Sequence, residues 1–449
     1  MSTPALQDSP DRSGGIPPTL TQPGAARFWL AVIGTGVGAG LGAAVLTRLL
    51  IYVQQLAWPG AGTLSEAVAR TSAWHHVGVL AIAGLMTGTG QLLLVHLSSG
   101  NSIDITAAIW FSAGRLPRLR TLGSAVLSVL DVALGASLGR EGAPKQVGAV
   151  LADALADRGR LSDEQRRLLV ACGAGAGLAA AYGVPLGGAL FALEVLRGML
   201  ALRLVLPALM ASLVATIVSW VALPDAPTYT LPPFRTSPSI IVFALVAGPI
   251  AGVVSVGYVR AIAWADRHKP SGWTRIILPT LVLAALGATS IAFPQLLGNG
   301  KDIAQTAFMG QLAPLLVLSL LFLKPLATIA CVRSGTPGGL FTPSLALGAL
   351  VGAALGYGWS LVWPGVTPGL FALVGAAALL AATTQGPIST VVLLMELTGH
   401  DRSFVVPVIL AVVTATLVAR TIEPRSIYDA KLSDAEVKER LRMRTPPPQ

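Results

Sequence analysis

Long apolar segments follow one another closely from residue 27 to about residue 427, and this pattern limits the possible fold more than any other feature. A helix needs about 20 apolar residues to cross the hydrocarbon core of a membrane. Segments of about this length lie at 28–53, 77–97, 122–138, 203–223, 238–265, 275–293, 311–332 and 403–420. Only 12% of the 449 residues are charged and the mean hydropathy is +0.70, whereas soluble domains carry about 25% charged residues. The sequence therefore predicts an all-α, multi-pass membrane protein.

Shorter apolar segments lie between the long ones, and Gly or Pro bounds or opens several of them. They cover residues 143–156, 168–181, 185–197, 340–357, 368–382 and 387–398. Many are too short to cross a membrane alone, which predicts broken and tilted helices. Backbone groups exposed by such breaks must be buried in protein or line a polar cavity. Matching interrupted segments in two halves of a chain are typical of a transport site.

Two stretches of the first half recur in the second half at nearly the same offset. At an offset of 202 residues, the matched positions are Leu178-Ala179-Ala180 with Leu380-Ala381-Ala382, Pro185 with Pro387 and Glu194 with Glu396. At an offset of 200 residues, Gly148–Leu151 matches Gly348–Val351. The common order predicts a duplicated architecture with repeat halves at about 28–223 and 238–421.

The segments outside the apolar region divide the chain into three parts. Residues 1–26 contain no sustained apolar run, which predicts a disordered N-terminal leader. Residues 27–430 are expected to form the membrane domain and residues 431–449 a short tail. The net charge is +10, and the basic residues gather between and after the apolar segments. Because cytoplasmic loops of membrane proteins are enriched in Lys and Arg, we expect a cytoplasmic C-terminus and no nucleic-acid partner.

Neither cysteine nor histidine forms a pattern typical of a metal site. Two cysteines are too few for a disulfide framework or a cysteine metal site, and the five histidines have no HExxH or comparable spacing. No nucleophile–base pair or nucleotide-binding loop is recognisable. The sequence predicts no metal, no cofactor and no enzymatic activity.

Three Gly-rich stretches lie where helices are expected to begin: Ser99–Asp104, Gly139–Pro144 and Gly338–Pro343. A helix N-terminus carries about half a positive charge, and glycine lets backbone N–H groups approach a ligand. Three such ends that converge in a membrane would hold a small anion without a full positive charge, which favours rapid release. The alternative is that these glycines only permit tight turns and close helix packing.

Glu141 lies between Arg140 and Gly142 at one of these helix starts and follows a long apolar segment. A carboxylate at membrane depth is costly and usually functional. An ionised Glu141 would occupy the positive helix end and a protonated one would leave it to an anion, which couples proton movement to anion occupancy. The alternative is an exposed glutamate favoured by the helix dipole. Arg140 would be its ion-pair partner or a charge at the rim that attracts anions.

Other polar residues near or within apolar segments are interpreted mainly as structural. Glu194 and Glu396 are expected to be buried, hydrogen-bonded carboxyl groups that fix helix ends. Asp131 and Lys324 are expected to take part in an ion pair or in interhelical hydrogen bonds. Tyr428 either turns its hydroxyl into a cavity or anchors the chain at the membrane interface.

In their order along the chain, these motifs resemble those of the CLC family of chloride channels and chloride/proton antiporters. Ser137–Gly142 resembles the family's GREGP motif, Gly339–Pro343 its GxFxP motif, and Ala179–Glu194 its AAxFxxPLxGxLFxxE helix. Lys324–Thr328 is also typical of the family. The resemblance extends over about residues 28–430.

The resemblance implies a homodimer with one pore in each subunit, and two inverted halves of tilted helices within each subunit. Glu141 would be the gating and proton-accepting glutamate. The backbone amides of Leu340 and Phe341, the hydroxyl of Tyr428 and Asn101 at the usual serine position would coordinate chloride or another halide. The helix-end and rim positions would be Gly100, Gly139, Arg140, Gly142 and Gly339.

The tail also bears on the type of protein that the resemblance implies. The 21 residues after Tyr428 are too few for the paired cytoplasmic nucleotide-binding (CBS) domains of many eukaryotic members. The resemblance thus implies a prokaryotic-type protein in the lipid of the bacterial inner membrane, with a small anion and protons as its transported partners.

Several positions depart from the family's motifs and leave the function open between three hypotheses. Asn101 and Asp104 replace the serine and proline of the usual GSGIP, a motif that fluoride-exporting relatives also alter, and Ala143 replaces the proline of GREGP. Val195 occupies the position of the internal proton-transfer glutamate, which channel-type members and some exchangers also lack. The leading hypothesis is chloride/proton exchange gated by Glu141. The alternatives are a passive chloride channel, favoured by Val195, and a fluoride/proton antiporter, favoured by Asn101.

Overall fold

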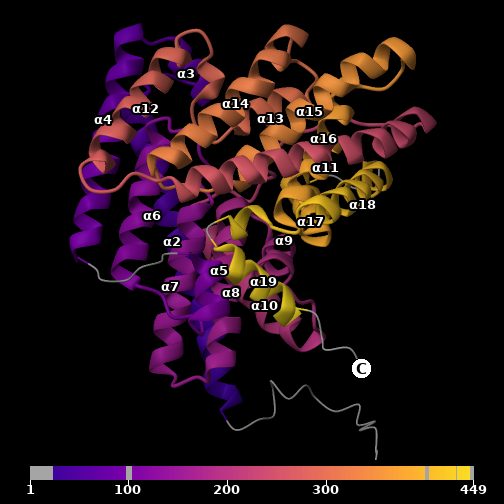
Figure 1. Ribbon diagram of the computed structural model, residues 1–449. Helices are drawn as coiled ribbons and strands as arrows, with labels where there is room; N and C mark the ends of the chain where they lie inside the picture. Colours follow the sequence, from indigo (N-terminus) through magenta and orange to yellow (C-terminus); the bar gives the residue numbers. More distant parts are fainter. Residues whose placement is uncertain (1–23, 98–103, 400–403, 431, 445–449) are drawn as a thin grey trace, which may run out of the picture.

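The computed structural model describes residues 24–97, 104–399, 404–430 and 432–444, and its regular structure within these ranges is helical (Figure 1). A single pair of residues in these ranges forms an isolated β-bridge, which lies at the site described below. The expectation of an all-α membrane protein is confirmed. Most of the predicted leader, together with Gly100 and Asn101, lies outside the described residues.

The helices of the first half are α2 (Ala25–Ala57), α3 (Leu64–Ala69), α4 (Ala73–Leu97), α5 (Ile105–Phe111), α6 (Arg118–Ala133), α7 (Gly142–Arg158), α8 (Asp163–Tyr182), α9 (Pro185–Leu190), the π-helical turn η1 (Phe191–Arg197) and α10 (Leu202–Ser219). Those of the second half are α11 (Pro238–Arg267), α12 (Thr274–Ser290), the 3-10 turn η2 (Pro294–Leu296), α13 (Lys301–Phe308), α14 (Pro314–Ser334), α15 (Phe341–Val362), α16 (Pro368–Thr384), α17 (Pro387–Thr398) and α18 (Val405–Ile422). The 3-10 turn η4 (Ile427–Asp429) and α19 (Asp434–Arg444) follow.

Six helical segments in the described ranges are long and apolar enough to cross a membrane: α2, α4, α11, α14, α15 and Val405–Asp429, which contains α18. Three predicted spans are shorter than expected, since α6, α10 and α12 have 16, 18 and 17 residues. Helix α6 ends early because Gly135 adopts a φ of +114°, and the apolar residues after it form the loop that leads to Gly139. Conversely, the segment 340–357, expected to be short, lies in the 22-residue helix α15.

The Ala- and Gly-rich helices α8 and α16 are buried along most of their length. Helix α8 packs against α7, and α16 packs against α15. A Cβ atom on Gly148 would lie 2.0 Å from the carbonyl oxygen of Gly173, and one on Gly348 would lie 2.6 Å from that of Gly375. The recurrence seen in the sequence therefore extends to packing, because matched glycines allow the same close helix contact in each half.

The carboxylates of Glu194 and Glu396 join the two halves. Glu194 accepts hydrogen bonds from the backbone N–H groups of Ile388 and Ser389 at the start of α17, and Glu396 does the same at the start of α9. The prediction that both residues fix helix ends is confirmed. Both side chains are half-buried and not fully buried as expected.

Asp131 and Lys324 are buried and make hydrogen bonds between segments. The Thr87 hydroxyl of α4 donates to Asp131 Oδ1 of α6 at 2.6 Å. Lys324 Nζ of α14 donates to the carbonyl oxygens of Leu296 and Gly298 at 2.9 and 2.8 Å. Of the two expectations, interhelical hydrogen bonding describes Asp131, and hydrogen bonds to backbone carbonyl groups describe Lys324.

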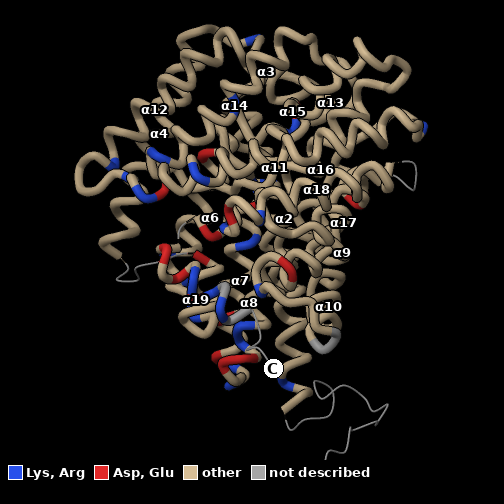
Figure 2. The backbone as a smooth tube through the Cα atoms, turned by 45° about the vertical axis from the view of Figure 1, so that its right-hand side comes forward, with Lys and Arg blue, Asp and Glu red and all other residues tan. Residues whose placement is uncertain are grey.

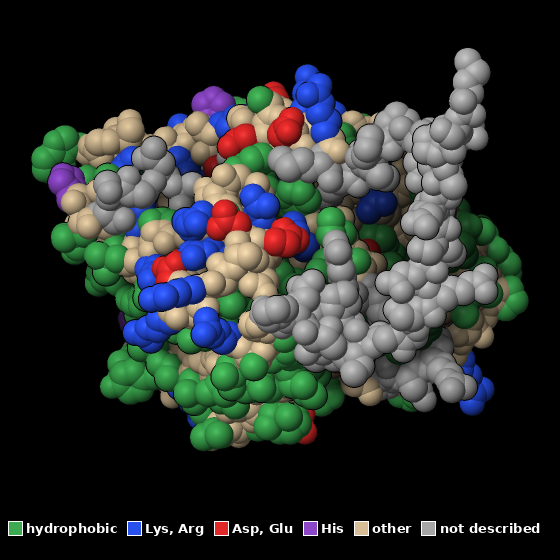
Figure 3. All heavy atoms as spheres, turned by 90° about the horizontal axis from the view of Figure 1, so that it is seen from below, with side chains coloured by type: hydrophobic (Ala, Val, Ile, Leu, Met, Phe, Trp, Pro, Cys, Tyr) green, Lys and Arg blue, Asp and Glu red, His purple; other side chains and the backbone are tan. Residues whose placement is uncertain are grey.

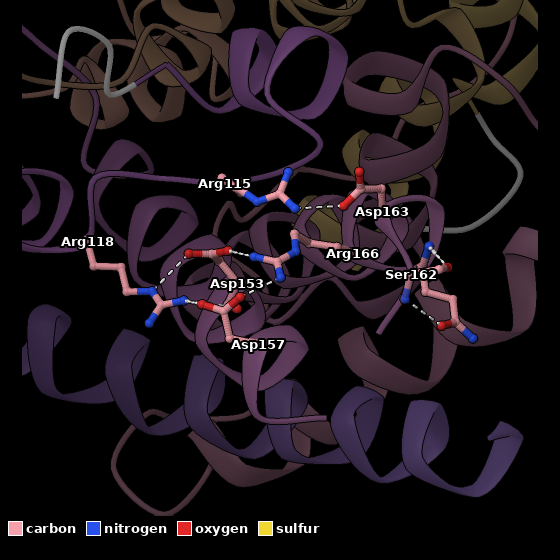
Figure 4. Close-up of polar contacts among 8 residues, drawn as sticks. Arg115, Arg118, Asp153, Asp157, Ser162, Asp163 and Arg166 are labelled. Carbon is pink, nitrogen blue, oxygen red and sulfur yellow. Dashed lines mark hydrogen bonds and ion pairs between the residues drawn. The ribbon is translucent and has the colours of Figure 1, made fainter. Parts of the chain in front are cut away.

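Charged residues gather at one side of the molecule, around α6, α7, α8 and α19 (Figure 2). Seen from below, basic and acidic side chains lie together beside an area of hydrophobic side chains (Figure 3). Within this region Asp153 and Asp157 of α7 each pair with both Arg118 and Arg166, while Arg115 pairs with Asp163 (Figure 4). These pairs connect the polar ends of α6, α7 and α8.

Helix α19 packs back against the membrane domain through Arg440. This side chain is 2% exposed, pairs with Asp429, and lies 5.3 Å from the ring centroid of Trp110. It also donates a hydrogen bond to the carbonyl oxygen of Val195 at 2.8 Å. Part of the basic tail is therefore an integral element of the fold.

Candidate functional site

Two helix starts meet at the centre of the candidate site. Gly139 and Gly339 exchange backbone hydrogen bonds of 2.7 Å in each direction and form the isolated β-bridge. Gly139 precedes α7 and Gly339 precedes α15, so the bridge brings the N-termini of these helices together. A Cβ atom on Gly142 would lie 3.1 Å from the backbone nitrogen of Gly339. The two Gly-rich stretches predicted to converge do so.

Glu141 lies between these helix starts and is completely buried. Its Oε1 atom accepts a hydrogen bond of 2.6 Å from the backbone N–H of Phe341, the first residue of α15. Its Oε2 atom accepts hydrogen bonds from the hydroxyls of Thr342 at 3.2 Å and Tyr182 at 3.4 Å. These two hydroxyls also lie 2.9 Å from each other. The carboxyl group is thus enclosed by donors, and the alternative of an exposed glutamate is wrong.

The glycines of the bridge leave room for this carboxyl group. A Cβ atom on Gly139 would lie 2.2 Å from either Glu141 carboxylate oxygen, and one on Gly339 would lie 2.1 Å from Oε1. Any larger residue at either position would have to displace the carboxyl group or the backbone. The missing side chains of these glycines create the space that Glu141 fills, which agrees with the packing interpretation.

The start of α15 is electrostatically suited to a negative charge. The N–H groups in the first turn of a helix have no partner within the helix and carry the positive end of its dipole. Glu141 Oε1 occupies the position of an anion bound to the N–H of Phe341. The negative charge of the carboxylate therefore lies at the positive end of α15, bonded to a backbone N–H that could serve an anion.

Arg140 lies beside the site and contacts an aromatic ring. Its Cζ atom lies 4.8 Å from the ring centroid of Tyr182, whose hydroxyl donates to Glu141. Among the described residues Arg140 forms no ion pair with Glu141, and instead contacts the ring of a residue that donates to the carboxyl group. The guanidinium thereby keeps a positive charge close to the site.

Tyr428, in η4, is placed near the start of α7 by its aromatic contacts. Its ring packs edge-on against Phe191 with centroids 5.3 Å apart, and the Nζ atom of Lys145 lies 4.6 Å from its centroid. Its hydroxyl is buried and has no hydrogen-bond partner among the described residues. The alternative of an anchor at the membrane interface does not fit this burial.

A cavity of about 420 Å³ borders the segment before α15, where Gly338 lines it. Arg120, Lys269 and Arg275 line it, as do Asp104 and the half-buried Leu340. Asp104 caps α5 by accepting a hydrogen bond from the N–H of Ala107 at 2.9 Å. Asp104, which stands where the family's motif usually has proline, thus caps a helix at the wall of this cavity.

Val195, at the position expected to decide proton transfer, is buried in η1. Its carbonyl oxygen accepts the hydrogen bond from Arg440. The aliphatic side chain supplies no titratable group. Gly100 and Asn101, the remaining site residues expected from the sequence, lie outside the described residues.

Three residues of the site were not among the candidates from the sequence. Tyr182 ends α8 directly before Gly183, Thr342 follows Phe341, and Lys145 lies four residues after Glu141. The i, i+4 spacing of Glu141 and Lys145 is a signal that could have identified the lysine. Tyr182 lies 41 positions from Glu141 in the chain, and nothing in the sequence alone indicates this contact.

A family model described as voltage gated chloride channel matches residues 96–420. The chain belongs to this family. It is 32% identical over 90% of its length to the putative chloride channel protein ClcB-like of Ralstonia nicotianae, of which the alignment covers 96%. It is also 31% identical over 70% of its length to the H(+)/Cl(-) exchange transporter ClcA of Vibrio campbellii, of which 69% is covered.

Solved structures of family members share the fold. A slow cyanobacterial Cl-/H+ antiporter superposes with a TM-score of 0.76 at 24% identity, with 92% of this chain and 98% of that chain covered. A CLC-type fluoride/proton antiporter superposes with a TM-score of 0.73 at 21% identity, with 90% and 98% covered. The predicted CLC fold is confirmed.

Proposed function

We propose that this protein exchanges a small anion, chloride in the first place, for protons across a membrane, with Glu141 as both gate and proton acceptor. The observation that carries this proposal is the position of the Glu141 carboxyl group, buried and hydrogen-bonded to the first N–H of α15. A carboxylate there excludes an anion from the same donor. Anion transport also agrees with the chain's membership of the voltage-gated chloride channel family.

The proposed cycle follows from the chemistry of the carboxyl group. When ionised, Glu141 accepts charge-assisted hydrogen bonds from Phe341, Thr342 and Tyr182. Protonation removes the negative charge, weakens these bonds and frees the helix end. A halide then binds the released donors, with the amide of Leu340 beside that of Phe341, and the loss of the proton returns Glu141 to the site. Anion and proton thus alternate at one place.

The remaining ligands belong to the same proposal. The Tyr428 hydroxyl would bind the anion further along the route, and Asn101 would contribute its side-chain amide from the stretch that begins with Gly100. Gly139, Gly142 and Gly339 would keep the helix ends accessible, and Arg140 would raise the local anion concentration.

The cellular setting is also part of the proposal. We expect a homodimer with one pore per subunit in the lipid of a bacterial inner membrane, and the charged side around α19 in the cytoplasm. Leu186 of α9 and Ile388 of α17 are exposed on the protein surface, which suits a contact with lipid or with a second subunit. The three-part division at residues 26 and 430 belongs to this proposal as well.

A passive chloride channel is the second candidate, and the valine at position 195 favours it. An exchanger needs protons to reach Glu141 from both sides, and Val195 offers no carboxyl group for the inner step. A relative described as a voltage-gated ClC-type chloride channel, ClcB of Citrobacter koseri, is 30% identical over 82% of this chain. A fluoride/proton antiporter is the third candidate and is favoured by Asn101.

The test is to reconstitute the purified protein in chloride-loaded vesicles and to record external pH during chloride efflux. Exchange predicts uphill proton movement into the vesicles without an ionophore, whereas a channel predicts chloride efflux that drives no proton movement. The same vesicles loaded with fluoride test the third candidate, because a fluoride antiporter would move protons faster with fluoride than with chloride. Empty vesicles provide the background.

A further inference from the structure

Lys145 lies one helical turn after Glu141 on the same helix. Its backbone N–H donates to the carbonyl oxygen of Glu141 at 3.4 Å, so both side chains project from the same side of the first turn of α7. The sequence motifs do not assign a role to this lysine. Its position relative to the gate follows only from the helical geometry.

The ammonium group of Lys145 is held among aromatic rings inside the protein. The residue is 6% exposed, and its Nζ atom lies 4.6 Å from the ring centroid of Tyr428 and 5.2 Å from that of Phe191. Ring faces attract a cation and keep it oriented.

Tyr428, whose ring contacts the Lys145 ammonium group, carries a second donor. Its hydroxyl is buried without a hydrogen-bond partner among the described residues, although a buried hydroxyl normally has one. A lysine ammonium group has three donors and no acceptor, and a tyrosine hydroxyl readily donates. The neighbourhood therefore offers donors and positive charge, which are complementary to an anion.

We propose that Lys145 supplies a fixed positive charge to an anion bound at the Tyr428 hydroxyl, and that this charge sets the affinity of the protein for the anion at that position. The inference rests on the proposed function, since it adds a ligand to the same anion route. An anion site with a lysine differs from one lined only by amides and hydroxyls, because a full charge in a poorly hydrated site binds a halide more strongly and releases it more slowly.

The experiment measures halide binding to the purified protein in detergent by isothermal titration calorimetry with chloride. Lys145→Met keeps the length of the side chain and removes its charge, and we expect the dissociation constant to rise at least about tenfold, which corresponds to about 1.4 kcal/mol. Lys145→Arg keeps the charge and should stay close to the wild type. Lys438→Met, which removes an exposed charge of α19, is the matched control and should not change binding.

An unchanged chloride affinity in Lys145→Met would overturn the inference. Equal losses of affinity in Lys145→Met and Lys145→Arg would also overturn it, because they would show that the packing of the lysine matters and its charge does not. Bromide in crystals of the unchanged protein gives a test that needs no variant. We expect anomalous density in contact with Lys145 Nζ and Tyr428 Oη, and density confined to the Phe341 amide would contradict the inference. A protein that binds chloride through Lys145 but moves no protons would contradict the proposed exchange and leave this inference standing.

Discussion

Gly139 and Gly339 exchange two backbone hydrogen bonds of 2.7 Å, and the carboxyl group of Glu141 fills the space that a side chain on either glycine would need. The bridge and the Glu141 carboxyl group therefore form one packed unit. The backbone pairing aligns the starts of α7 and α15, and the missing side chains let the carboxylate reach the helix end. A single methyl group added to Gly139 or Gly339 would therefore collide with the carboxyl group of Glu141.

The substitution Gly339→Ala should displace Glu141 from the start of α15. The new Cβ atom would lie 2.1 Å from Oε1, much closer than van der Waals contact, and insertion of a group into a packed site costs about 1–3 kcal/mol. We expect a lower melting temperature and anion efflux that depends less on pH, because the carboxyl group no longer closes the site. Efflux from vesicles at acidic and neutral pH measures this.

Gly257→Ala is the matched control for this variant. Gly257 lies in α11, where an added Cβ atom would meet nothing within 4 Å. The pH dependence should stay at the wild-type level and the stability should not fall, because alanine favours a helix more than glycine does. If Gly339→Ala keeps the pH dependence of the unchanged protein, the fit of the carboxyl group against this glycine does not control access.

The substitution Glu141→Gln should reduce proton movement to the level of empty vesicles while anion flux remains measurable. The amide group has nearly the same shape and can still accept the hydrogen bond from Phe341, but it cannot be ionised and carries no proton through the cycle. The measurement is the external pH recorded during chloride efflux. Glu439→Gln, an exposed residue of α19, controls for the loss of a carboxylate. Retained proton pumping in Glu141→Gln would overturn its assigned role.

Much of the architecture could be predicted from the sequence because it depends on local pattern. Apolar length predicted five of the six spanning segments in the described ranges but not α15. The offset of about 200 residues predicted that matched glycines and glutamates would play matched parts. Glu141 was recognisable because a carboxylate after a long apolar segment is costly. Phe341 was recognisable because glycines mark a helix start that approaches another backbone.

Contacts between distant segments could not be predicted. Tyr182 and Thr342 surround the carboxyl group from α8 and α15, 160 positions apart in the chain, and a single sequence holds no information on that distance. Nothing in the sequence of the basic tail indicates that Arg440 is buried against Trp110 and Val195. The end of α6 was expected at residue 138 and lies at Ala133, because its apolar sequence continues as a buried loop and hydropathy does not distinguish a helix from a loop.

The substitutions Glu194→Gln and Glu396→Gln should destabilise the protein to a similar extent. Each carboxylate accepts two backbone hydrogen bonds from the start of a helix in the other half, at 3.1 and 2.6 Å for Glu194 and at 3.0 and 2.7 Å for Glu396. Hydrogen bonds to a charged group contribute about 1.5–3 kcal/mol when buried, and partial exposure reduces this to about 1 kcal/mol. Thermal unfolding in detergent measures the loss.

Proton movement per chloride should stay unchanged in both of these variants, because neither carboxylate touches the proposed anion site. The stability loss of the double variant should differ from the sum of the two single losses, because α9 and α17 are in contact. A large effect of one substitution alone would contradict the equivalence of the two positions.

The pairing of Asp157 predicts how stability depends on pH. Hydrogen bonds from Arg166 and Arg118 lower the pKa of Asp157 below its ordinary value of 3.8. A lowered folded-state pKa stabilises the folded protein above pH 3.8, and this contribution is lost as the pH falls from there through the folded-state pKa. Since the side chain is 46% exposed, solvent screening keeps the effect small. Asp157→Asn should lower the melting temperature at neutral pH and flatten its fall in acid, whereas Asp225→Asn, in an exposed loop, should do neither. An equally steep acid dependence in Asp157→Asn would mean that carboxylates elsewhere determine the acid sensitivity of the fold.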